Sequence, residues 1–264
     1  MLGAGALLTP WAAAAAPKSQ LLDPSWRKTG SGGDPDYADW AGFLSTYAKL
    51  GGDGIVYVDY ARAKRDGGHA KLAFWLMSAE SVDPTTLAPD AQFAWWVNLY
   101  NARTVELVLK AFPVESIMEV EGGLFNTGPW GEDVFEINGV KLSLDDVEHG
   151  ILRPIFGDER VHYAVNCASI GCPNLATTPW TSAGLSARLD KAARDYVNHP
   201  RGATVSGGKL TVSKIYTWFQ EDFGGDDAGV IAHLKAHADA PLASALNGVS
   251  KISDEVYDWS LNGV

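Results

Sequence analysis

Both cysteines of the chain lie in one short segment, HYAVNCASIGCPN (162–174), which begins with a histidine. Cys167 and Cys172 are five positions apart, and His162 is five positions before Cys167. Three kinds of chemistry fit these residue types. The thiols can form a disulfide, Cys167 can act as a nucleophile with an imidazole as base, or thiols and imidazoles can bind a metal.

The first expectation is a disulfide between Cys167 and Cys172. Gly171 and Pro173 bend the short connection, so the two Cα atoms can come within the roughly 4.4–6.8 Å that a disulfide requires. Two cysteines this close in an exported chain ordinarily pair. The spacing is not C-x-x-C, so thioredoxin-like redox chemistry is not indicated.

The alternative is a thiol nucleophile, with His149 or His162 as its base. The segment RVHYAV is predicted as a strand, whose alternation places the His162 ring and the Cys167 thiol on opposite faces. This favours His149, in the predicted short helix LDDVEHGILR, where His149 faces inward and Glu148 or Asp146 faces solvent. A hydrogen-bonded packing role explains His149 equally simply. The candidate catalytic residues are Cys167, His149, His162, Asn98, Asn101 and Glu148.

Asn98 and Asn101 lie one turn apart in a predicted helix that is apolar nearly all round, AWWVNLYNA (94–102). A buried amide left unpaired costs about 1–3 kcal/mol, so both must find partners. Either they hold neighbouring loops through backbone groups, or one of them orients an imidazole or donates to an oxyanion. Backbone N–H groups of the cysteine loop are further candidate oxyanion donors.

A metal site is the third reading. His149, His162, Cys167 and Cys172 are the residue types of a structural zinc site, but their spacing is not one that zinc sites use. Glu148-His149 does not belong to an HExxH motif. The sequence therefore predicts no metal and no cofactor.

Charge and aromatic content limit the partners. The net charge of −11 argues against nucleic acid and against an anionic membrane surface. A groove lined by Trp95, Trp96, Trp130 and Trp180 would suit a peptide or sugar ligand, and core packing would explain the same residues. The expected partner is a small molecule, peptide or sugar.

The N-terminal segment has a short apolar run that ends in small residues before Pro17. This pattern predicts a signal peptide over 1–16, although no Lys or Arg precedes the run, and hence a periplasmic or secreted protein without a membrane span after cleavage. Residues 17–36 are predicted to be a flexible lead-in, and 37–264 a single domain.

Hydrophobic periodicity predicts helices over 37–50, 69–80, 89–112, 181–199 and 213–224. Two hairpins are predicted at Asn138-Gly139 and Gly207-Gly208. Ser143 is predicted to form a capping box with Asp146. For the 181–199 helix, Thr181 or Ser182 is the expected cap. The predicted fold class is α+β, a mainly helical domain with small antiparallel hairpins.

Five stretches together resemble the DUF547 family of bacterial and plant proteins. They are FAWWVNLYNA (93–102), LSLDDVEHGILRP (142–154), ERVHYAVNCASIGCPNL (159–175), LTVSKIYTWFQEDFG (210–224) and YDWSLN (257–262). The resemblance covers roughly residues 70–262. It implies a set of positions that are characteristic of the family, but no established reaction. It also implies that the cysteine pair is kept in plant proteins that look intracellular, which weakens a purely structural disulfide. Two functions remain: a binding module with a Cys167–Cys172 disulfide, or a thiol-dependent hydrolase or transferase.

Overall fold

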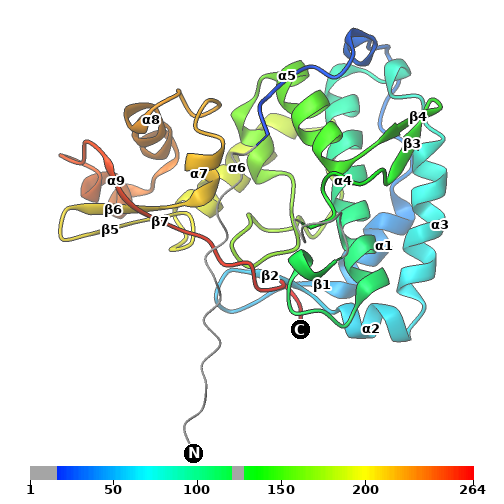
Figure 1. Ribbon diagram of the computed structural model, residues 1–264, viewed down its shortest axis with the longest axis horizontal. Coiled ribbons are helices and arrows are strands. Elements are labelled where there is room, and N and C mark those ends of the chain that lie inside the picture. Colours follow the sequence, from blue (N-terminus) through cyan, green and yellow to red (C-terminus); the bar gives the residue numbers. More distant parts are fainter. Residues whose placement is uncertain (1–16, 121–127) are drawn as a thin grey trace, which may run out of the picture.

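The computed structural model describes residues 17–120 and 128–264, so the predicted signal peptide (1–16) lies outside the described residues. Helices dominate this part of the chain, and its strands form small sheets (Figure 1). The predicted class, α+β and mainly helical with small antiparallel hairpins, is confirmed. No helix among the described residues is long and apolar enough to cross a membrane.

A larger lobe is built around the long helix α4, which spans Pro89–Ala111. Pro89 starts this helix and Pro113 follows its end, as a proline does where a helix cannot continue. Residues on every face of α4 are buried, so the helix is the centre of the larger core. The elements before it are η1 (Pro24–Arg27), α1 (Ala38–Tyr47), β1 (Ala48–Leu50), β2 (Val56–Val58), α2 (Tyr60–Arg65), α3 (Gly68–Glu80) and η2 (Pro84–Thr86).

The hairpin predicted at Asn138-Gly139 is formed by β3 (Phe135–Ile137) and β4 (Val140–Leu142). Asn138 and Gly139 both have positive φ, 52° and 76°, as a type I′ turn requires. The short helix η3 (Ile117–Glu119) precedes this hairpin in the chain.

After β4, the predicted capping box starts a helix of unexpected type. Asp146 Oδ2 accepts from the Ser143 backbone N–H at 2.8 Å, and Ser143 Oγ accepts from the Asp146 N–H at 3.0 Å. The following seven residues form a π-helix, η4 (Asp146–Leu152), which continues into α5 (Arg153–Phe156). π-Turns are rare and frequently occur at functional sites.

The predicted strand RVHYAV is wrong, because this segment forms the 3₁₀ helix η5 (Glu159–Tyr163). The Asp158 side chain caps η5 by accepting from the Arg160 N–H. His162 and Tyr163 are both buried, so the alternation of a strand is absent.

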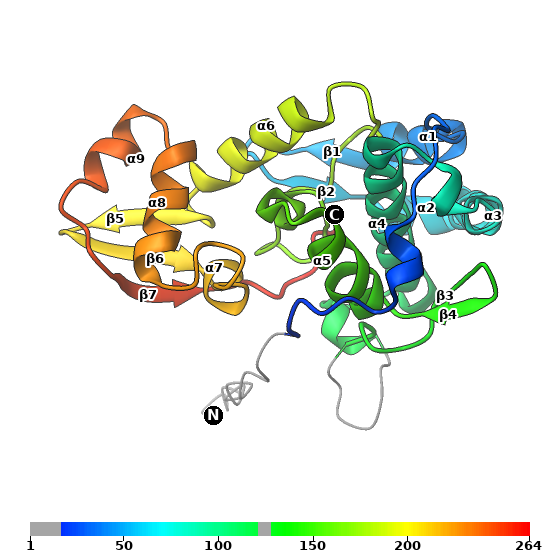
Figure 2. The same ribbon diagram turned by 90° about the horizontal axis from the view of Figure 1, so that it is seen from above.

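A smaller lobe has its own hydrophobic core, and α6 (Leu185–Val197) leads from the larger lobe into it (Figure 2). The helix α6 begins after Gly184 rather than at Thr181 or Ser182, because the Ser182 hydroxyl bonds Asp34 instead of a helix N–H. In the three-stranded sheet, β5 (Ala203–Ser206) and β6 (Lys209–Ser213) form the predicted Gly207-Gly208 hairpin, and β7 (Ile252–Val256) pairs in parallel with β6. The helices of this lobe are α7 (Lys214–Trp218), α8 (Asp227–His237) and α9 (Ala240–Ala245).

Both ends of the described chain bind the body of the protein. Residues 17–36, for which the sequence predicts a flexible lead-in, bury Trp26 against Trp96 and donate backbone hydrogen bonds to the carbonyls of His149 and Gly150. After β7, the chain returns to the larger lobe and ends beside β2 (Figure 1), where the Val58 N–H donates to Asn262 O. This C-terminal segment, residues 257–262, passes the cysteine loop.

Candidate functional site

The two cysteines lie as free thiols at the tip of a tight loop, with their Sγ atoms 2.8 Å apart. The Cys167 backbone N–H also points at Cys172 Sγ, at 3.0 Å. Ala168 has a positive φ of 58°, which turns the chain back, and the Cys172 N–H closes the turn on Ser169 O at 3.2 Å. The loop geometry predicted from the sequence thus brings both thiols together.

Two hydroxyl groups surround the sulfur of Cys167. Tyr257 Oη lies 2.9 Å and Ser169 Oγ 3.2 Å from Cys167 Sγ, and the two oxygens are 2.9 Å apart. Burial opposes a charged thiolate here, but hydrogen bonds from Cys172, Ser169 and Tyr257 outweigh it and lower the pKa of Cys167. Burial, followed by the nearby Cys167 sulfur, raises the pKa of Tyr257 well above its usual range, so its hydroxyl remains a donor.

The two thiols differ in environment. Cys172 is buried, whereas Cys167 is partly exposed. Burial, and then the adjacent Cys167 sulfur, raise the pKa of Cys172 well above its usual range. When the pair loses one proton, the negative charge therefore lies on Cys167, the more exposed of the two sulfurs.

Asn101 on α4 holds the chain just before the cysteine loop. Its Nδ2 donates to Ala164 O at 2.9 Å, and its Oδ1 accepts from the Asn166 N–H at 2.8 Å. Asn166 in turn donates to Pro173 O at 2.7 Å and accepts from the Ala168 N–H at 3.0 Å. Asn101 is thus a buried anchor of this loop, which confirms the expectation that it is hydrogen-bonded inside.

Two other segments fix the far side of the loop. Arg201 donates from Nη1 to the carbonyls of Ile170 and Cys172, both at 2.8 Å. The Gly171 N–H donates to Asp258 O at 2.8 Å, and a Cβ at position 171 would lie 2.8 Å from the Asp258 nitrogen, so only glycine fits there.

Asn98 is anchored elsewhere. Its Oδ1 accepts from Trp40 Nε1 at 3.2 Å and from the Trp180 N–H at 2.9 Å, and its Nδ2 donates to Trp180 O at 2.8 Å. Asn98 is buried and hydrogen-bonded as expected. It fixes the chain before α6 and makes no hydrogen bond to the cysteine loop among those of the described residues.

His162 is buried between two carboxylates. Its Nε2 is 2.7 Å from Asp222 Oδ2, its Nδ1 is 3.6 Å from Glu148 Oε1, and its ring stacks on Phe219 at 4.3 Å. Burial opposes protonation, but the hydrogen bonds to Asp222 and Glu148 outweigh it and raise the pKa of His162. Burial opposes the charge of Asp222 as well, but His162 and Arg153 hold its pKa at about 2.

His149 and Glu148 belong to the same cluster, and both are buried. His149 thus faces inward as expected, and of the two acidic residues expected to face solvent, Asp146 is partly exposed while Glu148 is not. Burial is the main cause that lowers the pKa of His149, whose Nδ1 lies 3.1 Å from Arg153 Nη1. Burial opposes the charge of Glu148, yet His149 and His162 hold its pKa at about 2. Glu148 Oε2 also accepts from Tyr100 Oη at 2.9 Å.

Apart from Asn98 and Asn101, which anchor backbone segments, the predicted site residues therefore fall into two groups. One is the thiol pair with its hydroxyl partners, and the other is the cluster of Glu148, His149 and His162. Tyr100 connects them electrostatically, since burial, then Glu148, then Cys167 raise its pKa well above the usual range. Among the hydrogen bonds of the described residues, none joins either imidazole to either sulfur.

Sequence reasoning missed five residues of these groups, and most of them lie far from the cysteines in the chain. Tyr257 and Asp222 fall within the stretches YDWSLN and QEDF, which carry the resemblance and could have drawn attention to them. Arg153 likewise falls within LSLDDVEHGILRP (142–154), whereas Arg201 has no local signal, because it is defined by the acceptors that surround it. Ser169 lies inside the cysteine loop itself.

The predicted tryptophan groove is not formed. Trp95, Trp96 and Trp180 are 1%, 0% and 3% exposed, so they belong to the larger core. Trp130 alone of the four is partly exposed. Large aromatic rings bury the most apolar surface, which is the physical reason for their place in the core.

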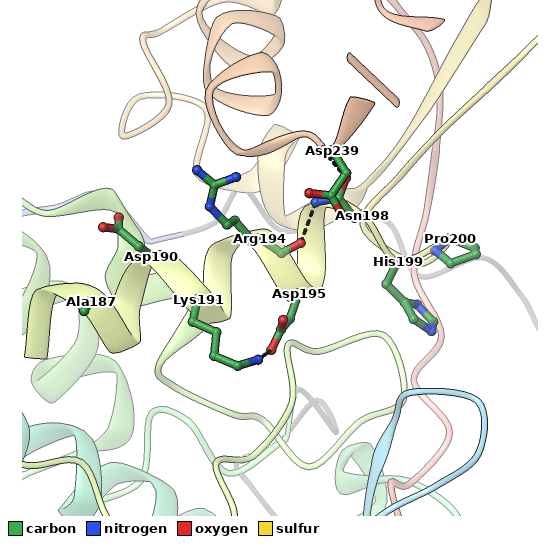
Figure 3. Close-up of a pocket in the computed structure, with 9 residues that line it drawn as sticks. All are labelled: Ala187, Asp190, Lys191, Arg194, Asp195, Asn198, His199, Pro200 and Asp239. Carbon is green, nitrogen blue, oxygen red and sulfur yellow. Dashed lines mark hydrogen bonds and ion pairs between the residues drawn. The ribbon is translucent and has the colours of Figure 1, made fainter. Parts of the chain in front are cut away.

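An open cavity of about 750 Å³ lies along α6 (Figure 3). Several of its charged and polar lining groups are already paired within the protein, as in the contact of Lys191 Nζ with Asp195 Oδ2 at 2.6 Å. Asn198 bonds Arg194 O and the Asp239 N–H. The predicted site residues do not line this cavity. Within 17–120 and 128–264, no three His, Cys, Asp or Glu side chains form a group able to hold a metal ion.

Fold and site together define the class: an α+β, mainly helical domain that carries a pair of unequal thiols beside a buried imidazole–carboxylate cluster. Residues 84–197 match the family described as protein of unknown function, DUF547, which supports the resemblance drawn from the sequence. The match includes α4, η4, the cysteine loop and α6, whereas Arg201, Asp222 and Tyr257 lie beyond it. Neither the curated proteins nor the solved structures include a match to this chain.

Proposed function

We propose that this domain carries out thiol–disulfide exchange, with Cys167 as the attacking thiol and Cys172 as the resolving thiol. The observation that carries the proposal is the unequal pair itself: two sulfurs 2.8 Å apart, one partly exposed with a lowered pKa and one buried with a raised pKa. The attacking species in such exchange is a thiolate, and its rate depends on thiolate fraction and access.

The reaction uses both cysteines. The Cys167 thiolate attacks one sulfur of a substrate disulfide, forming a mixed disulfide and releasing the other substrate sulfur as a thiolate. Cys172 then loses its proton and attacks the Cys167 sulfur, which expels the second substrate thiolate. The substrate disulfide is reduced to two thiols, and the protein is left with the Cys167–Cys172 disulfide that its sequence predicts.

The same geometry gives less support to acyl transfer, the other thiol chemistry. A thiol hydrolase needs a base at the sulfur and free donors for an oxyanion. Four N–H groups of the loop are committed to protein acceptors, namely those of Ala168, Ile170, Gly171 and Cys172. The amides of Asn98 and Asn101 are likewise occupied by backbone groups.

We further propose that the protein acts after export, in the periplasm or outside the cell. Disulfides form and persist in these compartments, so a substrate disulfide is available there. The support is the apolar N-terminal run that ends in small residues before Pro17.

The test is to trap the intermediate. Cys172→Ser should hold a mixed disulfide between Cys167 and a disulfide substrate, detectable by non-reducing mass analysis, whereas Cys167→Ser should form none. In glutathione buffers of graded potential, the wild-type pair should change between dithiol and disulfide. A pair that stays oxidised throughout would show a structural disulfide and overturn the proposal.

Histidine variants separate the two enzymatic readings. If His149 or His162 is the base of a thiol hydrolase, replacing it with Gln should slow alkylation of Cys167 strongly. Thiol–disulfide exchange by a thiolate held by Tyr257 and Ser169 predicts that both variants, if folded, alkylate at rates close to wild type.

A further inference from the structure

Four aromatic side chains form a patch that begins at the Cys167 sulfur. The aromatic patch consists of Trp130, Trp218, Tyr257 and Trp259. Ring centroids are 4.7 Å apart for Tyr257 and Trp259, 4.8 Å for Trp218 and Tyr257, and 5.8 Å for Trp130 and Trp259. Since Tyr257 Oη lies 2.9 Å from Cys167 Sγ, the patch is continuous with the attacking thiol.

The patch differs in exposure from the tryptophans of the larger core. All four of its residues are partly exposed, whereas Trp40, Trp95, Trp96 and Trp180 are buried in the larger core. Its members come from distant parts of the chain: the segment before β3, the end of α7, and the C-terminal segment. Partly exposed aromatic residues are typical of binding surfaces, because they offer apolar area together with polar edges.

The surroundings of the patch are acidic. Asp258 lies between Tyr257 and Trp259 in the chain and is exposed. Glu115 is also exposed, and its carbonyl accepts from the Leu261 N–H at 2.8 Å, which places it beside the same C-terminal segment. With a net charge of −11, the protein attracts cationic partners and repels small acidic thiols.

From this arrangement we infer the substrate class of the proposed site: polypeptide disulfides in which an aromatic residue and a basic residue flank the cysteine. The aromatic side chain packs on the patch while its neighbouring sulfur meets Cys167, and the basic side chain faces Asp258 and Glu115. This inference rests on the proposed function, since it assigns a partner to the same thiol.

Peptides that carry a chromophoric leaving group test it directly. Each peptide bears one cysteine joined by a disulfide to nitrothiobenzoate. The Cys167 thiolate attacks the peptide sulfur, the peptide–nitrothiobenzoate bond breaks, and the coloured thiolate leaves. With the Cys172→Ser protein, the Phe-Lys-Cys peptide should react about 2–10 times faster than Gly-Lys-Cys, because aromatic pairing contributes about that factor. Phe-Glu-Cys should be slower still at low salt, and the difference between Lys and Glu should shrink in 1 M salt.

A matched pair of variants locates the effect. Trp218→Leu should remove most of the preference for Phe over Gly, while Phe74→Leu should keep it. Phe74 is 70% exposed on α3, which lies across the molecule from α7 in both views (Figures 1 and 2). Alkylation by iodoacetamide, which is too small to span the patch, should be unchanged in Phe74→Leu, and in each variant it gives the reactivity of Cys167 against which peptide release is compared.

The outcomes distinguish the two proposals. No release from any peptide by Cys172→Ser protein that still alkylates would overturn the proposed function. Equal release from all three peptides would leave thiol–disulfide exchange standing and refute the substrate class. If Trp218→Leu fails to fold, the comparison of the three peptides with the Cys172→Ser protein still tests both proposals.

Discussion

Asn101→Ala should weaken the protein at a defined place, the chain entering the cysteine loop. The substitution removes two hydrogen bonds, to Ala164 O and from the Asn166 N–H, whose residues are 0% and 2% exposed. Water cannot replace the lost partners, so each orphaned backbone group costs about 1–3 kcal/mol. We expect unfolding free energy to fall by about 2–6 kcal/mol, toward the lower end where the segment relaxes.

Urea unfolding of the reduced protein measures this loss, with the slope checked for a two-state transition. The rate of Cys167 alkylation near neutral pH is the second measurement, because a displaced loop loses the hydrogen bonds that stabilise the thiolate. The matched control is Asn98→Ala, which removes three buried hydrogen bonds around Trp40 and Trp180 but leaves the loop's own anchors in place.

Both variants should therefore be less stable, and only Asn101→Ala should alkylate more slowly. A loss of unfolding free energy below about 1 kcal/mol for Asn101→Ala would refute the cost assigned to the two backbone groups that it leaves unpaired. Equal changes in alkylation for the two variants would show a general loosening rather than the positioning of this loop.

Four further predictions concern the thiolate, the buried cluster and export. Tyr257→Phe should slow the alkylation of Cys167 by about 10- to 150-fold near neutral pH, since a hydrogen bond to a charged group contributes about 1.5–3 kcal/mol; an unchanged rate would show that Tyr257 does not stabilise the thiolate. The raised pKa of His162 predicts stability that is fully present below the imidazole's unfolded pKa of about 6.5 and lost as pH rises through the folded value; His162→Gln should remove this part of the pH dependence in urea titrations. The lowered pKa of Asp222, about 2, acts in the opposite direction: its stabilisation is present above the carboxyl's unfolded pKa of about 4 and lost as pH falls toward 2, and Asp222→Asn should flatten the acid limb. Intact-mass analysis of protein from the native host should find roughly the first 15–20 residues missing, and retained Met1 would contradict export.

The elements that sequence predicts well are those whose signals are local. The helix over 89–112 has no Pro or Gly to interrupt it and is found as α4, and the hairpin at Asn138-Gly139 depends only on two residues that tolerate positive φ. The segment RVHYAV misled because its β-branched and aromatic residues favour a strand. Tertiary hydrogen bonds override that preference, since the backbone at Ala164 and Asn166 pairs with Asn101 on α4 rather than with a neighbouring strand.

The candidate site, like the fold, was predictable where its residues are close together in the sequence. The loop between Cys167 and Cys172 is short, so sequence alone places the thiols together. Tyr257, which helps to lower the pKa of Cys167, could not be predicted as its partner, because it lies 90 positions away and no periodicity links the two residues. The imidazoles, which sequence pairs with the thiol, have other partners. His162 binds Asp222, 60 positions away, to which no local pattern connects it, whereas His149 lies beside Arg153, four residues further along the same helical segment.

The position of Tyr257 also has a consequence for biosynthesis. Chains are made from the N-terminus at about 5–20 residues per second, so Cys167 precedes its tyrosine partner by roughly 5–20 s. During that interval the thiols exist without the C-terminal segment that orients them. Because the chain has two cysteines, the only wrong disulfides open to it then are those with another molecule. Errors of assembly should therefore appear as disulfide-linked adducts rather than as a misfolded monomer.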